Sequence, residues 1–233
     1  MVHELEKQGE GIDLAPLIEH TLLRPEATAR DCEQLCREAM NFRFYGVCVP
    51  PNRVRLARSL LAGSGVKVVT VAGFPLGFQT VAVKVFEIEN ALAAGAEEID
   101  AVLNIGALKE ARFSFVEAEV RSLMEAVRAA GRSGARPLLK IIVETCYLSD
   151  TEKTQAARLV LEAGADFVKT STGFAPGGAR VEDVALLREA AGGRLKIKAA
   201  GGIRTRAQAL ALVAAGADRL GTSRGPALVK FES

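Results

Sequence analysis

A short repeat, Ala-Gly-Ala followed by an acidic residue, places the strongest constraint on how this chain folds. Each copy ends an amphipathic helical stretch and begins a short apolar run, as is typical of a glycine that caps a helix and leads into a parallel strand. Five residues after the three glycines lie Asp100, Lys169 and Gly221. Equivalent positions thus carry a carboxylate, an amine and a glycine, which indicates one scaffold presenting different chemistry at a common rim. The three copies span residues 94–97, 163–166 and 215–218.

The rest of the chain alternates short strand candidates with helical segments. Eight strands with intervening helices predict an α/β fold of the (β/α)8 TIM-barrel type, and a doubly wound open sheet is the alternative architecture. Because a chain of 233 residues that is 49% hydrophobic can bury a large core, we expect a single domain over residues 1–233, with 1–11 as a polar extension. The strands are expected near residues 20–23, 46–49, 68–74, 99–104, 139–145, 167–172, 197–201 and 219–223. The clearest helices are expected at residues 81–94, 115–130, 151–163, 181–191 and 206–215.

Charge and cysteine usage exclude several classes of function. The net charge is only +2 and no basic run interleaves with aromatic residues, so we expect no nucleic-acid partner. No apolar stretch is long enough to span a bilayer and the N-terminus lacks a signal sequence, which predicts a cytoplasmic protein without a membrane partner. The cysteines show no spacing typical of a disulfide framework, and Cys32 and Cys36 are expected to be buried free thiols. Only His3 and His20 could complete a metal set with Cys32 and Cys36, so no metal is expected.

Two lysines, Lys169 and Lys198, stand near the ends of predicted strands, each before a glycine turn. In a barrel the functional side chains gather at the C-terminal ends of the strands, where Asp100 and Ser223 are also expected. An amine is a nucleophile at neutral pH only when its pKa is lowered, and a second ammonium nearby is one way to lower it. The alternative interpretation is two solvated surface lysines, since charged side chains are rarely buried.

Two glycine turns near the end of the chain predict a phosphate site. Gly201 and Gly202 follow the seventh predicted strand, and Gly221 lies in the eighth, the region where barrels often hold a phosphate on loop amides. Glycines let the backbone approach an anion closely, and Arg204 and Arg224 would add positive charge. Ordinary tight turns are the alternative interpretation of these glycines.

Seven segments, in this order and spacing, resemble the deoxyribose-phosphate aldolases, a family of Schiff-base (class I) aldolases with the barrel fold. The resemblance runs from about residue 20 to residue 225, and its most specific motif is Lys-Thr-Ser-Thr-Gly at 169–173. The segments that carry it are residues 20–25, 45–50, 71–77, 98–104, 139–145, 167–174 and 198–204.

The resemblance implies a role for each of three residues. Lys169 matches the lysine that forms the imine, Lys198 the lysine that lowers its pKa, and Asp100 the carboxylate that moves protons through water. The implied reaction is reversible cleavage of 2-deoxy-D-ribose 5-phosphate to D-glyceraldehyde 3-phosphate and acetaldehyde. It implies no cofactor and no metal, because the protonated imine is itself the electron sink. A small phosphosugar is therefore the expected partner, and we expect a homodimer or a homotetramer.

Eleven residues are expected to contact the substrate or its phosphate. These residues are Thr21, Cys48, Lys140, Thr172, Gly173, Gly201, Gly202, Arg204, Gly221, Ser223 and Arg224. The chain departs from the family pattern where Glu19 replaces an aspartate, where Arg224 replaces a serine, and at a C-terminus that lacks a terminal tyrosine.

Cys48 has two interpretations. It is either a thiol packed below the site or a thiol that reaches the cavity, where neighbouring lysines would favour its thiolate.

Three alternative functions also remain open at this point. They are a different Schiff-base aldolase with a ketone or keto-acid donor, a phosphosugar isomerase or synthase that forms no imine, and a phosphometabolite-binding barrel without catalysis.

Overall fold

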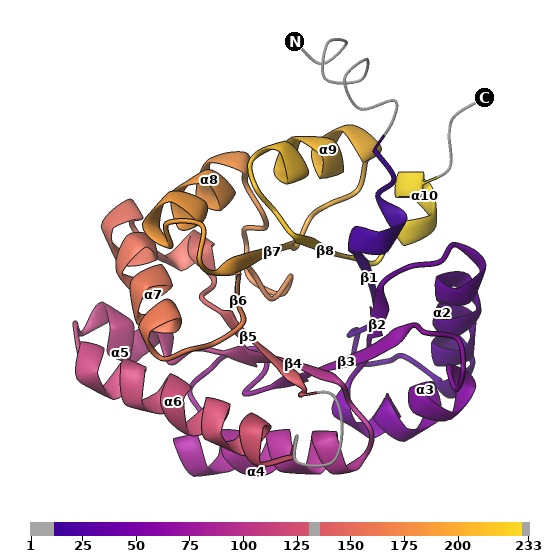
Figure 1. The fold of residues 1–233 in the computed structure, drawn as a ribbon, viewed down its shortest axis with the longest axis horizontal. Helices are drawn as coiled ribbons and strands as arrows, with labels where there is room; N and C mark the ends of the chain where they lie inside the picture. Colours follow the sequence, from indigo (N-terminus) through magenta and orange to yellow (C-terminus); the bar gives the residue numbers. More distant parts are fainter. Residues whose placement is uncertain (1–11, 131–135, 230–233) are drawn as a thin grey trace.

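The structure is a computed structural model that describes residues 12–130 and 136–229. Eight parallel strands pair in sequence order, and β1 closes the barrel by pairing with β8 (Figure 1). This closure confirms the predicted barrel and excludes the open sheet. The strands are β1 (Ile18–Thr21), β2 (Gly46–Cys48), β3 (Lys67–Ala72), β4 (Glu98–Val102), β5 (Leu138–Ile142), β6 (Phe167–Lys169), β7 (Lys196–Ala200) and β8 (Arg219–Thr222).

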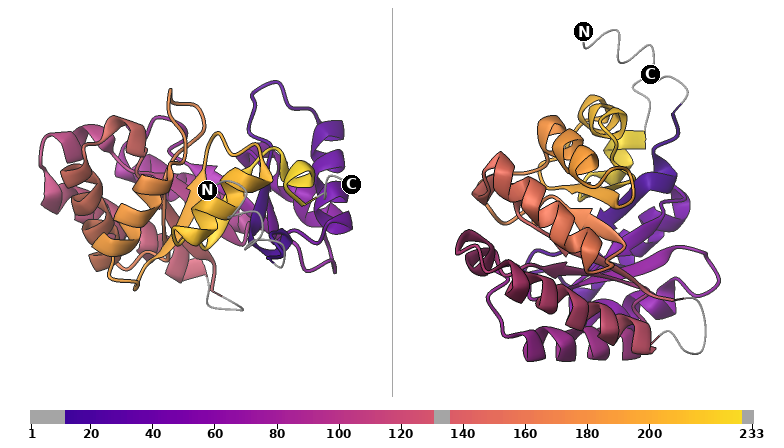
Figure 2. Two further views of the ribbon diagram at one scale, coloured as in Figure 1. Left: turned by 90° about the horizontal axis from the view of Figure 1, so that it is seen from above. Right: turned by 60° about the vertical axis from the view of Figure 1, so that its left-hand side comes forward.

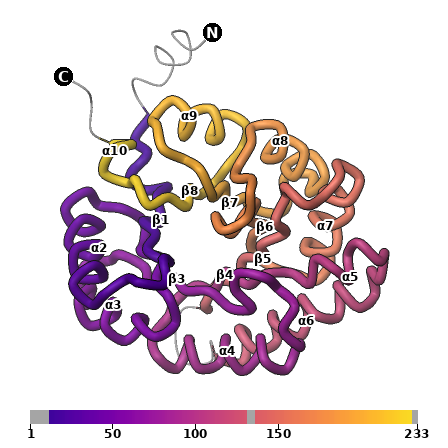
Figure 3. Tube along the Cα trace, turned by 180° about the vertical axis from the view of Figure 1, so that it is seen from behind, coloured from indigo at the N-terminus to yellow at the C-terminus, as the bar shows by residue number. Residues whose placement is uncertain are grey.

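The helices form a ring outside the strands, as both views down the barrel show (Figures 1 and 3). Short 3-10 helices supplement them at Ala15–Leu17, Pro51–Arg53 and Thr145–Tyr147. Within the described residues no helix is both long and apolar enough to cross a membrane. The α-helices are α2 (Ala29–Asn41), α3 (Val54–Leu60), α4 (Val81–Ala93), α5 (Ile105–Lys109), α6 (Phe113–Ala130), α7 (Asp150–Glu162), α8 (Val181–Ala190), α9 (Arg206–Ala214) and α10 (Gly225–Val229).

The three repeat glycines end helices as the sequence predicts. Gly95, Gly164 and Gly216 follow α4, α7 and α9 with φ angles of 104°, 82° and 108°. Side chains rarely tolerate this backbone region, so glycine lets the chain reverse at little cost and enter the next strand. The repeat therefore fixes where three strands start.

The acidic residue of each repeat has a structural role of its own. Its carboxylate accepts a hydrogen bond from a backbone N–H of the preceding strand of the barrel, which aligns the new strand with its neighbour. The donor and acceptor pairs are Val68 to Glu97 at 3.2 Å, Leu139 to Asp166 at 2.9 Å and Ile197 to Asp218 at 2.7 Å.

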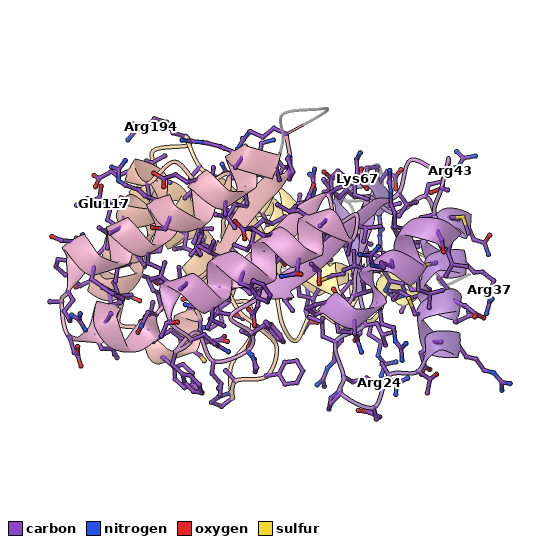
Figure 4. The ribbon with its side chains drawn as sticks, turned by 90° about the horizontal axis from the view of Figure 1, so that it is seen from below. Arg24, Arg37, Arg43, Lys67, Glu117 and Arg194 are labelled. Atoms are coloured by element: carbon purple, nitrogen blue, oxygen red, sulfur yellow. The ribbon has the colours of Figure 1, made fainter. Side chains whose placement is uncertain are left out.

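The two ends of the barrel differ in the residues and loops that lie there. In the side view of Figure 4, Lys67 and Arg194, at or just before the starts of β3 and β7, lie along one edge, and Arg24 lies on the opposite edge. Loops after β1 and β6 rise from the edge that carries Arg24 (Figure 2, left). These loops follow the C-terminal ends of the strands, so this is the end where barrels of this kind place their chemistry.

The observed strands are shorter than predicted at this end. The fifth was expected to reach residue 145 and the sixth residue 172, but β5 ends at Ile142 and β6 at Lys169. The reason is Glu144, whose φ of 53° and ψ of 68° turn the chain out of the sheet. Residues after Lys169 then pair through loop contacts, such as the bond from Thr145 N to Thr170 O at 2.9 Å.

Candidate functional site

A cavity of about 860 Å³ opens at the C-terminal end of the strands. Lys169 is the last residue of β6 and reaches this cavity from the barrel wall, although only 2% of its surface is exposed. The structure brings most of the expected site residues together here. Those that line the cavity are Thr21, Lys169, Thr172, Gly173, Gly201, Gly202, Arg204, Gly221, Ser223 and Arg224.

Asp100 lies below the cavity floor, fully buried, at the centre of a cluster of charges. Its Oδ2 accepts hydrogen bonds from Lys169 Nζ at 2.7 Å and from Lys198 Nζ at 2.6 Å. Its Oδ1 accepts from Lys140 Nζ at 2.9 Å. Burial alone would raise the pKa of Asp100, but the three ammonium groups together hold it well below its usual range. Asp100 is therefore a carboxylate at neutral pH and can accept a proton.

Lys169 has the electrostatic environment that a nucleophilic amine needs. Its pKa is lowered, first because burial disfavours the ammonium and then because the charge of Lys198 repels it. The carboxylate of Asp100 opposes both effects. From the sequence, a second ammonium was one way to lower the pKa of this lysine. In the structure, desolvation of Lys169 is the larger cause of its lowered pKa.

Lys198 and Lys140 remain charged. Lys198 is the third residue of β7, it does not line the cavity, and its ammonium also binds the carboxylate of Glu19. Burial lowers the pKa of Lys198, but Asp100 and Glu19 outweigh burial and leave that pKa raised. Lys140 lies 2.5 Å from Glu98 and 3.3 Å from Glu19, and the carboxylates around it raise its pKa well above the usual value. These buried pairs keep two permanent cations beneath Lys169.

The expected contact between Lys140 and substrate needs correction. Lys140 is fully buried in β5 and does not line the cavity, because its ammonium points into the barrel toward three carboxylates. It acts on Asp100 through charge and a hydrogen bond.

Of the two interpretations of Cys48, the structure favours the packed thiol over a thiol that contacts the cavity. It is fully buried, it packs with Val69 and Val71 under Leu23 and Phe74, and it is absent from the cavity lining. Burial raises the pKa of its thiol to about 11, although Lys198 and Lys169 act in the opposite direction. Desolvation outweighs the lysine charges, so the thiolate that the second interpretation required is disfavoured.

The loops after β7 and β8 carry the features expected of an anion site. Gly201 and Gly202 have φ angles of 88° and 74°, which let the turn after β7 present its backbone to the cavity. Arg224 N donates to Thr222 Oγ1 at 2.9 Å, which fixes the turn after β8. Both Arg204 and Arg224 line the cavity as exposed side chains. Among the described residues, no carboxylate forms an ion pair with either guanidinium. By contrast, Arg24, at the same cavity, pairs with Glu26 and Asp31.

The sequence interpretation gave no role to two buried carboxylates of this site. Glu19 was noted only as a departure from an aspartate, yet it contacts both Lys198 and Lys140. Glu144 stood inside a predicted strand, yet it accepts hydrogen bonds from the backbone and hydroxyl of Thr172. Burial raises the pKa of Glu144, while Thr172 and the charge of Lys169 oppose that rise. The available signal was an acidic residue within or next to an apolar run, a pattern that Asp100 shares.

Comparison with known proteins agrees with this geometry. The profile of the DeoC/LacD family aldolases matches residues 17–227. The chain belongs to this aldolase family. The deoxyribose-phosphate aldolase of Thermococcus gammatolerans is 52% identical over 222 residues, covering 94% of this chain and 96% of the relative. The deoxyribose-phosphate aldolase of Dictyoglomus turgidum is 49% identical, covering 93% and 96%.

Solved structures of the family have the same barrel. An aldolase named QR15 superposes with a TM-score of 0.86 at 40% identity, covering 94% of this chain and 95% of its own. A deoxyribose phosphate aldolase from Aeropyrum pernix, described as having a unique tetrameric structure, gives a TM-score of 0.86 at 34% identity, covering 98% and 95%. The fold and the family thus rest on both sequence and structure. The C-terminal tail noted above lies outside the described residues.

Proposed function

We propose that the protein is a class I aldolase that reversibly cleaves 2-deoxy-D-ribose 5-phosphate to D-glyceraldehyde 3-phosphate and acetaldehyde. The observation that carries this proposal is one buried amine, Lys169, which lines a cavity, has a lowered pKa and lies 2.7 Å from a carboxylate. Relatives about half identical over nearly the whole chain are named deoxyribose-phosphate aldolase, which supports the substrate.

The proposed reaction begins when the neutral amine of Lys169 attacks the aldehyde carbon of the open-chain sugar. The carbinolamine oxygen takes up a proton and leaves as water, which gives a protonated imine. The bond between C2 and C3 then breaks, its electron pair moves toward the imine nitrogen, and the C3 hydroxyl loses its proton as glyceraldehyde 3-phosphate forms. The remaining enamine is protonated at C2, and water releases acetaldehyde and regenerates the amine.

Asp100 and Lys198 are the proposed partners in these proton transfers. Asp100 is ionised at neutral pH because its pKa is lowered, so it can accept a proton, and the ammonium of Lys198 is a donor held on the same Oδ2 atom. A lowered amine pKa together with a persistent neighbouring cation matches what imine formation requires at neutral pH. Metal assistance has no part in this scheme, because the protonated imine draws the electrons.

We propose that the phosphate binds where the loops after β7 and β8 line the cavity. The supporting features are the backbone turns at Gly201, Gly202 and Gly221, the side chain of Ser223, and the guanidinium groups of Arg204 and Arg224. Backbone N–H groups and arginine are the donors that favour a phosphate dianion. Thr21, Thr172 and Gly173 also line this cavity and are available to contact the rest of the substrate.

Borohydride trapping tests the proposed imine. The wild-type protein incubated with acetaldehyde and borohydride gains a reduced two-carbon adduct on Lys169, which peptide mass spectrometry locates. Lys169→Ala abolishes both adduct and cleavage, whereas Lys109→Ala, which removes an exposed lysine of α5, leaves both unchanged. A wild-type adduct on Lys198 would refute the assignment of the nucleophile.

We also propose that the chain acts as a homo-oligomer of single-domain subunits in the cytoplasm. The tetrameric Aeropyrum pernix relative supports association. All four cysteines are free in the structure, which fits a reducing compartment. Light scattering coupled to size-exclusion chromatography gives the subunit number directly, and a monomer at micromolar concentration contradicts the association.

A further inference from the structure

Glu144 is a buried carboxylate at the rim of the site, and its role goes beyond the residues already considered. Only 1% of its surface is exposed, and its φ of 53° places it in the left-handed region. A residue with a side chain adopts this conformation rarely, and it persists where the surrounding contacts fix it. Glu144 follows β5 and precedes the 3-10 helix Thr145–Tyr147. The turn directs the Glu144 side chain across the barrel rim toward the loop after β6.

Within the described residues, the hydrogen bonds of the Glu144 side chain all lead to one residue of that loop. Its Oε2 accepts from Thr172 N at 3.1 Å and its Oε1 accepts from the same N–H at 3.3 Å. Its Oε2 also accepts from Thr172 Oγ1. Thr172 is three residues beyond Lys169 and lines the cavity. Glu144 therefore fixes both the backbone and the hydroxyl of a cavity residue next to the proposed nucleophile.

These contacts determine which way the Thr172 hydroxyl can bond. A hydroxyl has one proton to donate and two lone pairs that accept. The carboxylate of Glu144 takes the proton, and the backbone N–H of Phe174 donates to one lone pair at 3.1 Å. One lone pair is left for the cavity. A bound molecule can thus donate a hydrogen bond to Thr172 Oγ1 but cannot accept one from it.

We propose that Glu144 is a positioning and specificity-determining residue: it orients the Thr172 hydroxyl as a pure acceptor, so that the site prefers substrates whose carbon chain carries a hydroxyl donor. This inference rests on the proposed function, because a phosphorylated hydroxyaldehyde supplies that donor. It adds a selection step based on hydrogen-bond direction, which imine chemistry and phosphate binding do not provide.

Glu144→Gln is the sharpest perturbation because it reverses the direction of the bond while preserving size. With the amide oxygen in the place of Oε1, which accepts from Thr172 N, the amide nitrogen takes the place of Oε2 and donates to Thr172 Oγ1. The hydroxyl proton is then free to point into the cavity, where it can meet an acceptor. Thr172→Val removes the hydroxyl and is the second variant. Glu125→Gln, on the exposed face of α6, is the matched control.

The assay runs the reaction toward synthesis with acetaldehyde and three acceptors. These are D-glyceraldehyde 3-phosphate, its 2-deoxy analogue, and its 2-fluoro analogue, which can accept a hydrogen bond but not donate one. In the wild type kcat/KM favours the hydroxyl acceptor over both analogues. Glu144→Gln and Thr172→Val lower that preference by about three- to tenfold, the effect of one net hydrogen bond. Glu125→Gln leaves the preference at its wild-type value.

Acetaldehyde trapping separates this inference from the proposed function. Acetaldehyde has no hydroxyl, so Glu144→Gln is expected to leave the yield of reduced adduct on Lys169 within about twofold of the wild type. An equal loss of kcat/KM with all three acceptors, or an unchanged preference in both variants, overturns the role of Glu144 while an adduct still forms. Absence of any adduct in the wild type refutes the proposed function and this inference together.

Discussion

The ion pair between Lys84 of α4 and Glu119 of α6 gives the structure's most quantitative prediction. Both side chains are fully buried, and Lys84 Nζ lies 2.8 Å from Glu119 Oε1. The ammonium also donates to the carbonyls of Gly77 at 2.6 Å and Val102 at 2.8 Å. Glu119 Oε2 accepts from Asn104 N at 3.0 Å. The pair therefore holds the loops after β3 and β4 at the end of the barrel that carries the cavity.

The magnitude follows from what each substitution leaves behind. Glu119→Leu leaves the ammonium of Lys84 buried, where burial already lowers its pKa and Glu119 is the main opposing charge. Removing one partner of a buried pair costs about 3–5 kcal/mol. In a domain of this size that corresponds to a fall in Tm of about 6–20 °C. Lys84→Met combined with Glu119→Leu recovers part of the loss, because no unpaired charge remains, although the carbonyls of Gly77 and Val102 and the N–H of Asn104 lose this partner.

Urea and thermal denaturation followed by circular dichroism measure this cycle. The control is the exposed pair of Arg121 and Glu117, one turn apart on α6 with 54% and 30% of their side chains exposed, where Glu117→Leu costs less than about 1 kcal/mol. Two results would refute the assignment of a buried, coupled pair. One is a double variant whose loss of unfolding free energy equals the sum of the losses in the single variants at Lys84 and Glu119. The other is a loss for Glu119→Leu that is no larger than that for Glu117→Leu.

Three further predictions concern the site. Lys198→Leu removes a charge that lowers the pKa of Lys169, so the acid limb of the pH–rate profile moves to higher pH. Turnover at pH 7 then falls about tenfold or more and recovers partly at alkaline pH. If turnover does not recover at alkaline pH, Lys198 acts chiefly as a proton donor. Arg224→Ser lowers kcat/KM for deoxyribose 5-phosphate about two- to tenfold and leaves unphosphorylated deoxyribose unchanged, an effect that an equal response of both substrates contradicts. Iodoacetamide labels the exposed Cys146 in the native protein and reaches buried Cys48 only in urea, as peptide mass spectrometry can check.

The features that could be predicted from the sequence are those set by local spacing. The repeat glycines predict helix ends because only the left-handed region lets the chain reverse there, and Gly95, Gly164 and Gly216 adopt it. Counting from them predicts that Asp100 and Lys169 share a level of the barrel. They are the third residues of β4 and β6, and side chains from alternate strands form one layer.

The features that could not be predicted depend on depth and on loop packing. Lys140 lies in a short apolar strand, where the sequence does not distinguish a side chain that lines the cavity from one buried inside the barrel. The register of the closed barrel pairs Lys140 with Asp100 and brings its ammonium to that carboxylate. Cys48 is sealed by Leu23 and Phe74, which come from two loops far apart in sequence. Glu144 needs a left-handed turn inside a run of β-forming residues, which local propensity argues against.

In the proposed mechanism, the charges around Lys169 address two conflicting demands of imine chemistry. The free amine must be neutral to attack, whereas the protonated imine that follows must be a stable cation. Burial serves the first demand, because it is the largest influence that lowers the pKa of Lys169. Asp100 serves the second, because its carboxylate lies 2.7 Å from the same nitrogen and remains ionised through its contacts with Lys140 and Lys198. If burial neutralised this carboxylate, it could no longer stabilise the positively charged imine. Lys140 and Lys198 keep Asp100 ionised and so preserve the negative charge that stabilises the proposed cationic intermediate.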